Sequence, residues 1–542
     1  MTAISPRSMS WPPARGTACE IDQQSCHFMP SPPAYSGTIP EALARSAVFG
    51  ERDFIVDGDR RLTFREADAA SRRLARRLLA AGAGKGTRIG LRFANGAEFI
   101  LCWLAVCRIG AIAVTLSTLY KPPELAAVLR RSDVQFLLTN ASLLGVDATQ
   151  ALENALPELS RAAGPDLRLQ EAPYLRRIFV FGASGAPWAT PISLDDETPD
   201  ADDALLDAIE KQVVASDHAI LIFTSGTSAE PKGVLHTQAT MLRQGIDLLA
   251  RDGTPHRCLA VAPFFWVAGL TAVASALQQG AALITLEKLD PERGLELAER
   301  ERVSFVHIWP SLFERFRKHP SFATRDLSSI PDLAAATPPM ATKEEPTSNL
   351  GMTETMGSHV GQTNVERKLI DPETGQTVRD GEIGEISVRG PGVMVGYYKA
   401  DREAVFDRDG WFRTGDLALT RGADLYFQGR RNELIKVDGA NVSPLEVEQA
   451  LLQESRVTAA FVFGLDDAER GQIVGAVVVV QPEADLEAET LARAAAGRLS
   501  SYKAPRRLLL LTGDETPTLP SGKPDKRQLR QMLEQKGVRV LS

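Results

Sequence analysis

A run of small, hydroxyl-bearing and glycine residues follows a short apolar segment near residue 220. The apolar segment 219–223 has the composition of a buried strand, and it leads directly into Thr224, Ser225, Gly226, Thr227 and Ser228. Backbone N–H groups and hydroxyls presented at the end of a strand bind anions, and the nearby Lys232 adds a cation. The spacing does not fit the Walker pattern. The sequence therefore predicts a loop that holds a polyphosphate, with a Ser/Gly-rich surface loop as the alternative.

Residues further along the chain supply other groups that phosphate chemistry needs. Glu354 follows Thr353, and Asp416 lies in a glycine-containing stretch. A single protein carboxylate suffices for Mg²⁺, which is usually bound through one or two carboxylates plus substrate phosphates. Near the C-terminus Lys523 follows Ser-Gly, and small residues let a loop enter a crowded site. Each of these groups alone has the character of a solvated surface residue, so they carry weight only together.

These segments resemble, in order, the motifs of the adenylate-forming superfamily, which contains acyl-CoA synthetases, luciferases and peptide-synthetase adenylation domains. The six stretches are a phosphate loop (223–233), an aromatic pocket motif (263–270), a phosphate and magnesium motif (351–354), a ribose motif (410–416), a hinge (429–439) and a lysine motif (520–524). Six ordered matches make chance a poor explanation. The resemblance implies an ATP-dependent ligase that converts a carboxylic acid to an acyl-adenylate and transfers the acyl group to coenzyme A.

The resemblance implies a role for each matched residue. Lys523 serves the first half-reaction, Thr353 donates to the α-phosphate, Glu354 holds Mg²⁺, and Asp416 accepts hydrogen bonds from both ribose hydroxyls. Cations are needed because the acid attacks a phosphorus surrounded by negative oxygens. Like charges about 4 Å apart repel by roughly 4 kcal/mol at an effective dielectric near 20. The other residues expected to bind ATP or coenzyme A are Ala335, Ala336, Leu350, Gly351, Arg430 and Gly439.

The resemblance also predicts an acid pocket and a hinge. Trp266, Gly269 and Trp309 are expected to line the pocket, while core packing explains the two tryptophans nearly as well. A bulky tryptophan wall favours a medium-chain, aromatic or polycyclic acid over a very long chain, within or near fatty acid metabolism. Asn432 and Glu433 stand where the family rotates its small domain between adenylation and thiol transfer.

Three positions depart from the family pattern. Ala229 replaces a glycine of the phosphate loop, which restricts its backbone, and Trp266 replaces a common histidine. The segment between Leu333 and Gly351 is short, and Leu350 stands where a tyrosine usually stacks on adenine. Leucine offers an apolar contact without a π-face. A nucleotide- or acyl-binding paralogue with weak or no activity is therefore an alternative hypothesis.

Apolar strands that alternate with helical patterns predict an α/β fold whose sheets are mixed and mostly parallel, with flanking helices. We expect a loose N-terminal arm (1–36), a large N-terminal AMP-binding domain (37–428) and a small, mobile C-terminal α+β domain (429–542) that carries the lysine motif. The apolar run 99–116 is interrupted by Arg108 and Gly110. It predicts a buried helix followed by a strand rather than a membrane span.

Two helix starts carry capping-box patterns, one from Thr63 to Glu66 and one from Ser443 to Glu446. In this pattern the first residue bonds the backbone three residues on, and the acidic residue bonds back. Pro444 adds a residue suited to the first helical position. We expect both helices to begin at these residues.

The bulk composition sets the remaining expectations. The 542 residues exceed one ordinary core, and 44% hydrophobic with 24% charged residues is typical of globular chains. A net charge of −8 gives no reason to expect nucleic acid or an anionic membrane as a partner. Five irregularly spaced cysteines and no apolar leader favour the cytoplasm. Loading of a carrier protein in place of coenzyme A is a further alternative, and the oligomeric state stays open, with a dimer among the options.

Overall fold

An eight-stranded sheet forms the centre of the large N-terminal region. The computed structural model describes residues 37–195, 202–224, 231–244, 248, 250–251, 254–308, 310–330, 346–347, 350–360, 364–433, 435–437, 440–467, 470–482, 484–499, 503–519 and 523–541. The sheet has the order β21-β11-β10-β4-β3-β5-β8-β9. Its strands are β3 (Arg88–Arg92), β4 (Ile112–Thr115), β5 (Phe136–Asn140), β8 (Arg177–Phe181), β9 (Ala189–Ile192), β10 (His218–Thr224), β11 (Lys232–Thr237) and β21 (Gly396–Tyr397). All neighbours from β10 to β9 pair in parallel, whereas β11 and β21 are antiparallel additions.

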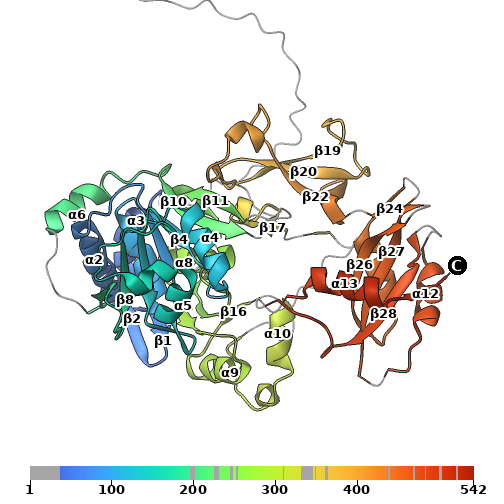
Figure 1. The fold of residues 1–542 in the computed structure, drawn as a ribbon, viewed down its shortest axis with the longest axis horizontal. Coiled ribbons are helices and arrows are strands. Elements are labelled where there is room, and N and C mark those ends of the chain that lie inside the picture. The colour runs from blue at the N-terminus through green and yellow to red at the C-terminus, as the bar shows by residue number, and fades with distance from the viewer. Residues whose placement is uncertain are drawn as a thin grey trace, which may run out of the picture. The chain divides into compact units, whose positions relative to one another are not determined.

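A second, five-stranded sheet has the order β16-β14-β15-β1-β2 and is also mostly parallel. Its strands are β1 (Asp53–Asp57), β2 (Arg60–Thr63), β14 (Arg257–Ala260), β15 (Ala282–Thr285) and β16 (Phe305–His307). One continuous apolar core joins this sheet to the eight-stranded sheet. Its helices are α1 (Ile39–Ser46), α2 (Phe64–Ala80), α3 (Ala97–Arg108) and α8 (Val267–Gln279), with smaller contributions from α6 (Asp203–Glu210) and α7 (Gln238–Arg243). The predicted mixed, mostly parallel sheets with flanking helices are confirmed (Figure 1).

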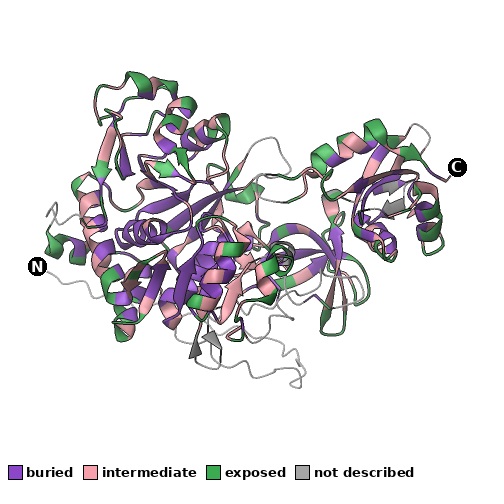
Figure 2. Ribbon diagram, turned by 90° about the horizontal axis from the view of Figure 1, so that it is seen from below, coloured by how far each residue is buried: buried purple, intermediate pink, exposed green. Residues whose placement is uncertain are grey.

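The outer faces of both sheets carry separate cores. On the eight-stranded sheet the cover includes α4 (Pro122–Arg131) and α5 (Ala148–Ala155), and on the five-stranded sheet it includes α9 (Pro291–Arg300) and α10 (Pro310–Arg317). Figure 2 shows buried residues along the sheets and inner helices, with exposed residues on the outer helical turns. Parallel strands covered on both faces explain why these strands are continuous apolar runs without alternation.

The run 99–116 forms the helix α3 followed by the strand β4, as predicted. Every residue of this helix except Glu98 is buried, and the Arg108 guanidinium bonds Ser71, Asp68 and Glu210. The burial is against neighbouring helices and both sheets, so the apolarity serves the core. Within the described residues, no helix is long and apolar enough to cross a bilayer.

The remainder of the chain adds two smaller sheets. Strands β19 (Glu366–Ile370), β20 (Gly384–Arg389), β22 (Phe412–Arg421) and β23 (Asp424–Arg430) form an antiparallel sheet. The last sheet contains β24 (Ile435–Val437), β25 (Ala440–Val442), β26 (Val457–Asp467), β27 (Gly471–Val480), β28 (Arg507–Thr512) and β29 (Val538–Arg539). Its helices are α11 (Pro444–Leu452), α12 (Ala488–Ala496) and α13 (Lys526–Lys536), and together they build the predicted small α+β region.

The two predicted capping boxes have different outcomes. At α2 the Thr63 hydroxyl accepts from the Glu66 N–H while Glu66 accepts from the Thr63 N–H, as predicted. At α11 the helix begins at Pro444 as expected, but its capping box is absent. The Ser443 hydroxyl instead donates to the Gln428 carbonyl oxygen at 2.7 Å. A contact with β23 therefore replaces the local cap.

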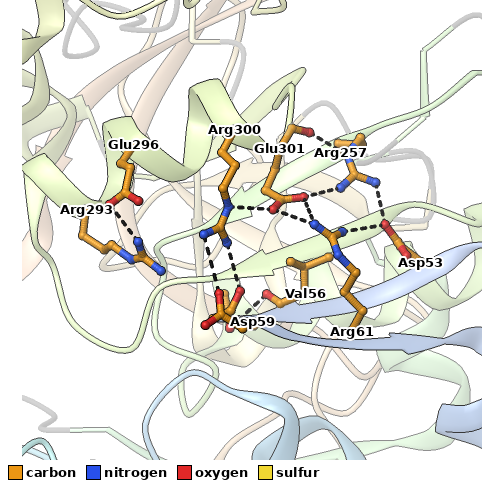
Figure 3. A network of polar contacts seen from close by, with 11 residues as sticks. Asp53, Val56, Asp59, Arg61, Arg257, Arg293, Glu296, Arg300 and Glu301 are labelled. Atoms are coloured by element: carbon orange, nitrogen blue, oxygen red, sulfur yellow. Dashed lines mark hydrogen bonds and ion pairs between the residues drawn. The ribbon is translucent and has the colours of Figure 1, made fainter.

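A buried carboxylate at the end of α9 links the strands β2 and β14 of the five-stranded sheet. The Glu301 side chain is 2% exposed and accepts hydrogen bonds from Arg61, Arg257 and Arg300 at 2.8–3.0 Å (Figure 3). Asp53 bridges Arg61 and Arg257 at 3.1 Å. Burial opposes the charge of Glu301, yet the arginine hydrogen bonds and charges outweigh it and lower the pKa of this carboxyl.

Replacing Glu301 with glutamine should destabilise the protein by about 3 kcal/mol, because three guanidinium groups lose their shared anion. Urea unfolding should report the loss. The matched control is Glu296→Gln, which breaks a half-exposed pair with Arg293 and should cost under about 0.5 kcal/mol. Since the folded pKa of Glu301 is lowered, its contribution is complete above the unfolded value of about 4.3 and is lost as the pH falls through the folded pKa. A loss no larger than that of the control would contradict this role.

Candidate active site

Two strand ends flank the predicted phosphate loop. Thr224 ends β10 and Lys232 begins β11, and the two residues are paired across the antiparallel ladder. Ser225, Gly226, Thr227, Ser228 and Ala229 lie outside the described residues. The Lys232 side chain is exposed, and its Nζ lies 5.0 Å from the ring centroid of Tyr397. The sheet thus places a hydroxyl and a cation at the two ends of the predicted loop.

The segment predicted to be the phosphate and magnesium motif is a tight turn between two short strands. Gly351 and Met352 (β17) pair with Gly357 and Ser358 (β18), and the residues between them begin with the 3₁₀ turn Thr353–Thr355. Gly351 is required by close packing, since a Cβ atom there would lie 1.6 Å from the Gly357 carbonyl oxygen. This close approach explains why a glycine precedes the Thr-Glu pair.

Replacing Gly351 with alanine should open this turn. We expect a loss of about 2 kcal/mol in the free energy of unfolding, since backbone atoms must move to admit the methyl group. Urea unfolding measures the loss. Gly396→Ala is the control, because a Cβ atom at Gly396 meets nothing within 4 Å. The same cost for both substitutions would show that the approach of Gly351 to Gly357 is not what constrains the turn.

Glu354 has the surroundings expected of a carboxylate that awaits a cation. Its side chain is 7% exposed, and its Oε1 accepts a hydrogen bond from the Tyr397 hydroxyl at 2.8 Å. Within the described residues it has no ion-pair partner. An unpaired buried carboxylate is costly, and a divalent cation would offset that cost. No group of three or more metal-binding side chains occurs among the residues that the structure describes.

Asp416 is fully buried, and the hairpin of β22 and β23 places Arg430 directly opposite it. The Arg430 Nε lies 2.8 Å from Oδ1, and the His359 Nε2 lies 3.8 Å from Oδ2. Neither Asp416 oxygen accepts a hydrogen bond of good geometry from the described residues. Burial raises the pKa of Asp416 to about 6, against the opposing effect of Arg430. Two buried acceptors without donors suit the two adjacent hydroxyls of a ribose.

The predicted adenine contacts are described only in part. Ala335 and Ala336 lie outside the described residues, as does most of the short segment between Leu333 and Gly351. Leu350 is half-buried and packs against the core of the four-stranded sheet. Its carbonyl oxygen accepts from the N–H groups of His359 and Val360. Its contact with adenine stays a prediction.

Two of the three residues predicted for the acid pocket, Trp266 and Gly269, lie at the start of α8. Trp266 is the N-cap residue of this helix and is half-buried. A Cβ atom on Gly269 would lie 2.3 Å from the Pro263 carbonyl oxygen, so helix packing requires this glycine. Asn95 fixes the same segment, donating to the carbonyl oxygens of Ala260 and Ala262 and accepting from the Phe264 N–H. Trp309 lies outside the described residues.

The predicted hinge and the predicted lysine motif lie in the C-terminal part of the chain. Arg431–Glu433 form a 3₁₀ turn directly after β23, and Lys526 donates to Glu433 at 3.2 Å. The Asn432 side chain and Gly439 lie outside the described residues. Lys523 is exposed, its carbonyl oxygen accepts from the Leu519 N–H, and its Nζ lies 5.9 Å from the ring centroid of Trp266.

Several buried polar residues that support the 351–358 turn escaped the sequence reasoning. His236 Nε2 donates to the Thr353 carbonyl oxygen at 2.7 Å, and Gln244 Nε2 donates to the Thr355 carbonyl oxygen at 2.7 Å. Burial lowers the pKa of His236 to about 4, so the ring is neutral near pH 7. The sequence contains one indication of His236, because side chains alternate along a strand and His236 therefore lies on the same face of β11 as Lys232. Gln244 and Tyr397 contact the turn only through tertiary structure, so no local sequence pattern indicates their role.

Comparison with known proteins agrees with this geometry. The family model "AMP-binding enzyme" matches residues 43–398, and the model of the AMP-binding enzyme C-terminal domain matches residues 446–523. The first match reaches from α1 to Tyr398, just beyond β21, and includes the predicted phosphate loop and the 351–358 turn. The second match ends at Lys523.

Individual relatives cover nearly the whole chain. A Mycobacterium tuberculosis CoA ligase for a methyl-dioxo-octahydroindenyl propanoate is 30% identical, over 91% of this chain and 99% of its own length. A feruloyl-CoA synthase from Amycolatopsis is 29% identical, over 87% of this chain and 94% of its own length. The structure of Bacillus subtilis o-succinylbenzoate CoA synthetase with its acyl-adenylate intermediate matches with a TM-score of 0.67 and 25% identity. The match covers 91% of this chain and 98% of the synthetase. With both family models matched in order, the chain belongs to the AMP-binding enzyme family.

Proposed function

We propose that the protein is an AMP-forming acid–thiol ligase that activates a carboxylic acid with ATP and transfers the acyl group to coenzyme A. In the first half-reaction the acid carboxylate attacks the α-phosphorus of ATP, forming acyl-AMP and releasing pyrophosphate. In the second, the thiol attacks the acyl carbon, forming the thioester and releasing AMP and a proton. The observation that carries the proposal is the pair of buried, unsatisfied Asp416 oxygens, which His359 connects to the Thr353–Thr355 turn. The His359 Nε2 lies 3.8 Å from Asp416 Oδ2, and its Nδ1 lies 3.3 Å from the Thr355 hydroxyl.

Each predicted residue has a place in the first half-reaction. Thr224 and Lys232, with the loop between them, bind the phosphates, and Asp416 accepts from the ribose hydroxyls. Glu354 holds Mg²⁺. When bound, this ion would lower the negative charge of the phosphates that the attacking carboxylate meets. Lys523 approaches the developing charge on the α-phosphate and the leaving pyrophosphate. Arg430 holds Asp416 in its charged form, because the ion pair lowers the pKa that burial raises.

The second half-reaction requires the two parts of the chain to move. The chain leaves the four-stranded sheet at Arg430 and enters the last sheet at Ile435, so the intervening residues suit a hinge. The predicted domains, 37–428 and 429–542, divide next to this segment, at the end of β23. Rotation about Asn432 and Glu433 would remove Lys523 from the active site. It would bring in the segment around Gly439, which would then lie beside the entering thiol.

The acid is proposed to be medium-chain, aromatic or polycyclic. Trp266 at the start of α8 limits the pocket, and the relatives described above act on a fused-ring propanoate and a feruloyl acid. The buried free thiols of Cys102, Cys107 and Cys258 support a reducing compartment, the cytoplasm. Coenzyme A is the proposed acceptor, as the relatives' names indicate.

Acid-dependent exchange of labelled pyrophosphate into ATP tests the proposal. The panel should contain octanoate, a cinnamate-type acid and a fused-ring propanoate. We expect exchange with at least one acid, and AMP with the matching CoA thioester once coenzyme A is added. If a thioester formed only on a carrier protein, that protein would replace coenzyme A as the proposed acyl acceptor. ATP-induced stabilisation without exchange for any acid would establish the binding-only alternative.

A further inference from the structure

Tyr397 lies on β21, at the edge of the eight-stranded sheet, beside the strand that follows the phosphate loop. In the ladder it pairs with Val234 of β11. The flanking backbone is fixed as well, since the Val395 N–H donates to Leu235 at 2.9 Å and the Tyr398 N–H to Gly233 at 2.7 Å. The position of Tyr397 relative to Lys232 is therefore set by sheet hydrogen bonds.

The Tyr397 side chain contacts both charged groups that flank the proposed triphosphate. Its hydroxyl donates to Glu354 Oε1 at 2.8 Å, and its ring centroid lies 5.0 Å from Lys232 Nζ. The second distance is within cation–π range. A tyrosine hydroxyl is protonated at physiological pH, so it is the donor in this hydrogen bond.

The hydrogen bond constrains a carboxylate whose backbone is already fixed. The Glu354 carbonyl oxygen accepts from the Met394 N–H at 2.8 Å, and the neighbouring Thr353 carbonyl oxygen accepts from His236. The side-chain torsions of Glu354 are then the remaining freedom. Because Tyr397 occupies one carboxylate oxygen, the other is held in one orientation and left for a cation.

We propose that Tyr397 is a positioning residue that orients Glu354 toward the metal and gives Lys232 an aromatic face beside the phosphates. This inference rests on the proposed function, in which Glu354 holds Mg²⁺. Hydrogen-bond partners of metal-binding carboxylates commonly change metal affinity by 10- to 100-fold when they are removed. The adjacent tyrosine has no such role, because the Tyr398 hydroxyl donates to Asp133 at 2.9 Å.

The matched pair Tyr397→Phe and Tyr398→Phe tests the proposal. Pyrophosphate exchange is measured against free Mg²⁺ at fixed ATP and acid. For Tyr397→Phe we expect the half-saturating Mg²⁺ concentration to rise about 10-fold, with the rate at saturating Mg²⁺ within about 2-fold of the wild type. Tyr398→Phe should leave both values within about 2-fold. An unchanged Mg²⁺ dependence in Tyr397→Phe, or a rate reduced equally at all Mg²⁺ concentrations, would overturn the proposal.

A second readout does not require turnover. Water-proton relaxation of Mn²⁺ bound with a non-hydrolysable ATP analogue should show about 10-fold weaker binding to Tyr397→Phe. The loss should vanish when Tyr397→Phe is made in Glu354→Gln, because both residues act through one carboxylate. Equal losses in both backgrounds would refute the coupling. If the wild type binds Mn²⁺ with the analogue but exchanges pyrophosphate with no acid, the proposed function fails while this inference is still decided.

Discussion

Lys523→Ala should lower acid-dependent pyrophosphate exchange by about 10²-fold or more, the scale of losing one charge-stabilising contact in the transition state. The lysine lies in a short chain reversal, where Thr518 and Pro524 form an isolated bridge. Its side chain is exposed and reaches the Trp266 ring, so its removal leaves no cavity. The melting temperature should therefore stay close to that of the wild type.

Two comparisons make the Lys523 result specific. Lys536→Ala removes an exposed lysine from the last turn of α13 and should leave exchange within about 2-fold. Lys523→Ala should also convert a chemically prepared acyl-adenylate to the CoA thioester at close to the wild-type rate, because the lysine serves only the first half-reaction. Equal exchange in Lys523→Ala and the wild type would remove the lysine from the mechanism.

Asp416→Asn should separate stability from activity. The KM for ATP should rise about 10²-fold, because charge-assisted hydrogen bonds to the ribose hydroxyls contribute about 1.5–3 kcal/mol each. In the ligand-free protein the substitution should stabilise. A pKa raised from 3.8 to about 6 corresponds to a cost of roughly 3 kcal/mol for keeping this carboxylate charged, and asparagine avoids it. Arg430 loses its partner, but its side chain is 44% exposed and can be solvated.

The pH dependence gives the sign of this effect. Because the folded pKa of Asp416 is raised, its favourable contribution to stability is complete below the unfolded pKa and is lost as the pH rises through about 6. Asp416→Asn should thus be more stable than the wild type at pH 8, and the advantage should disappear near pH 4. Asp424→Asn, at the exposed turn of the same hairpin, should show neither effect. A destabilised Asp416→Asn at pH 8 would contradict the unsatisfied carboxylate.

Sequence reasoning succeeded where the determinants are local. The apolar segment 219–223 forms the strand β10 as predicted, and Thr63 is the N-cap of α2 because its capping box lies within four residues. The same pattern at Ser443 was wrong as a capping box, since the competing acceptor is Gln428 on another strand. Short-range patterns cannot register such a competitor.

The contacts that hold the proposed site residues in place depend on how distant strands pair. Asp416 faces Arg430 because of the register between β22 and β23, and Tyr397 reaches Glu354 because β21 pairs with β11. Sequence resemblance selected Asp416, Arg430 and Glu354 individually without their geometry. It passed over Tyr397 because two adjacent tyrosines in a glycine-rich segment carry no chemical signature.

The fate of the substrate oxygens tests the central claim, formation of an acyl-adenylate, most directly. The acid is supplied with both carboxylate oxygens as ¹⁸O, together with ATP, Mg²⁺ and coenzyme A, and the products are analysed by mass spectrometry. Since the carboxylate attacks the α-phosphorus and the thiol later breaks the acyl–oxygen bond, AMP should carry one ¹⁸O and pyrophosphate none. Unlabelled AMP, or label in free phosphate, would contradict the acyl-adenylate.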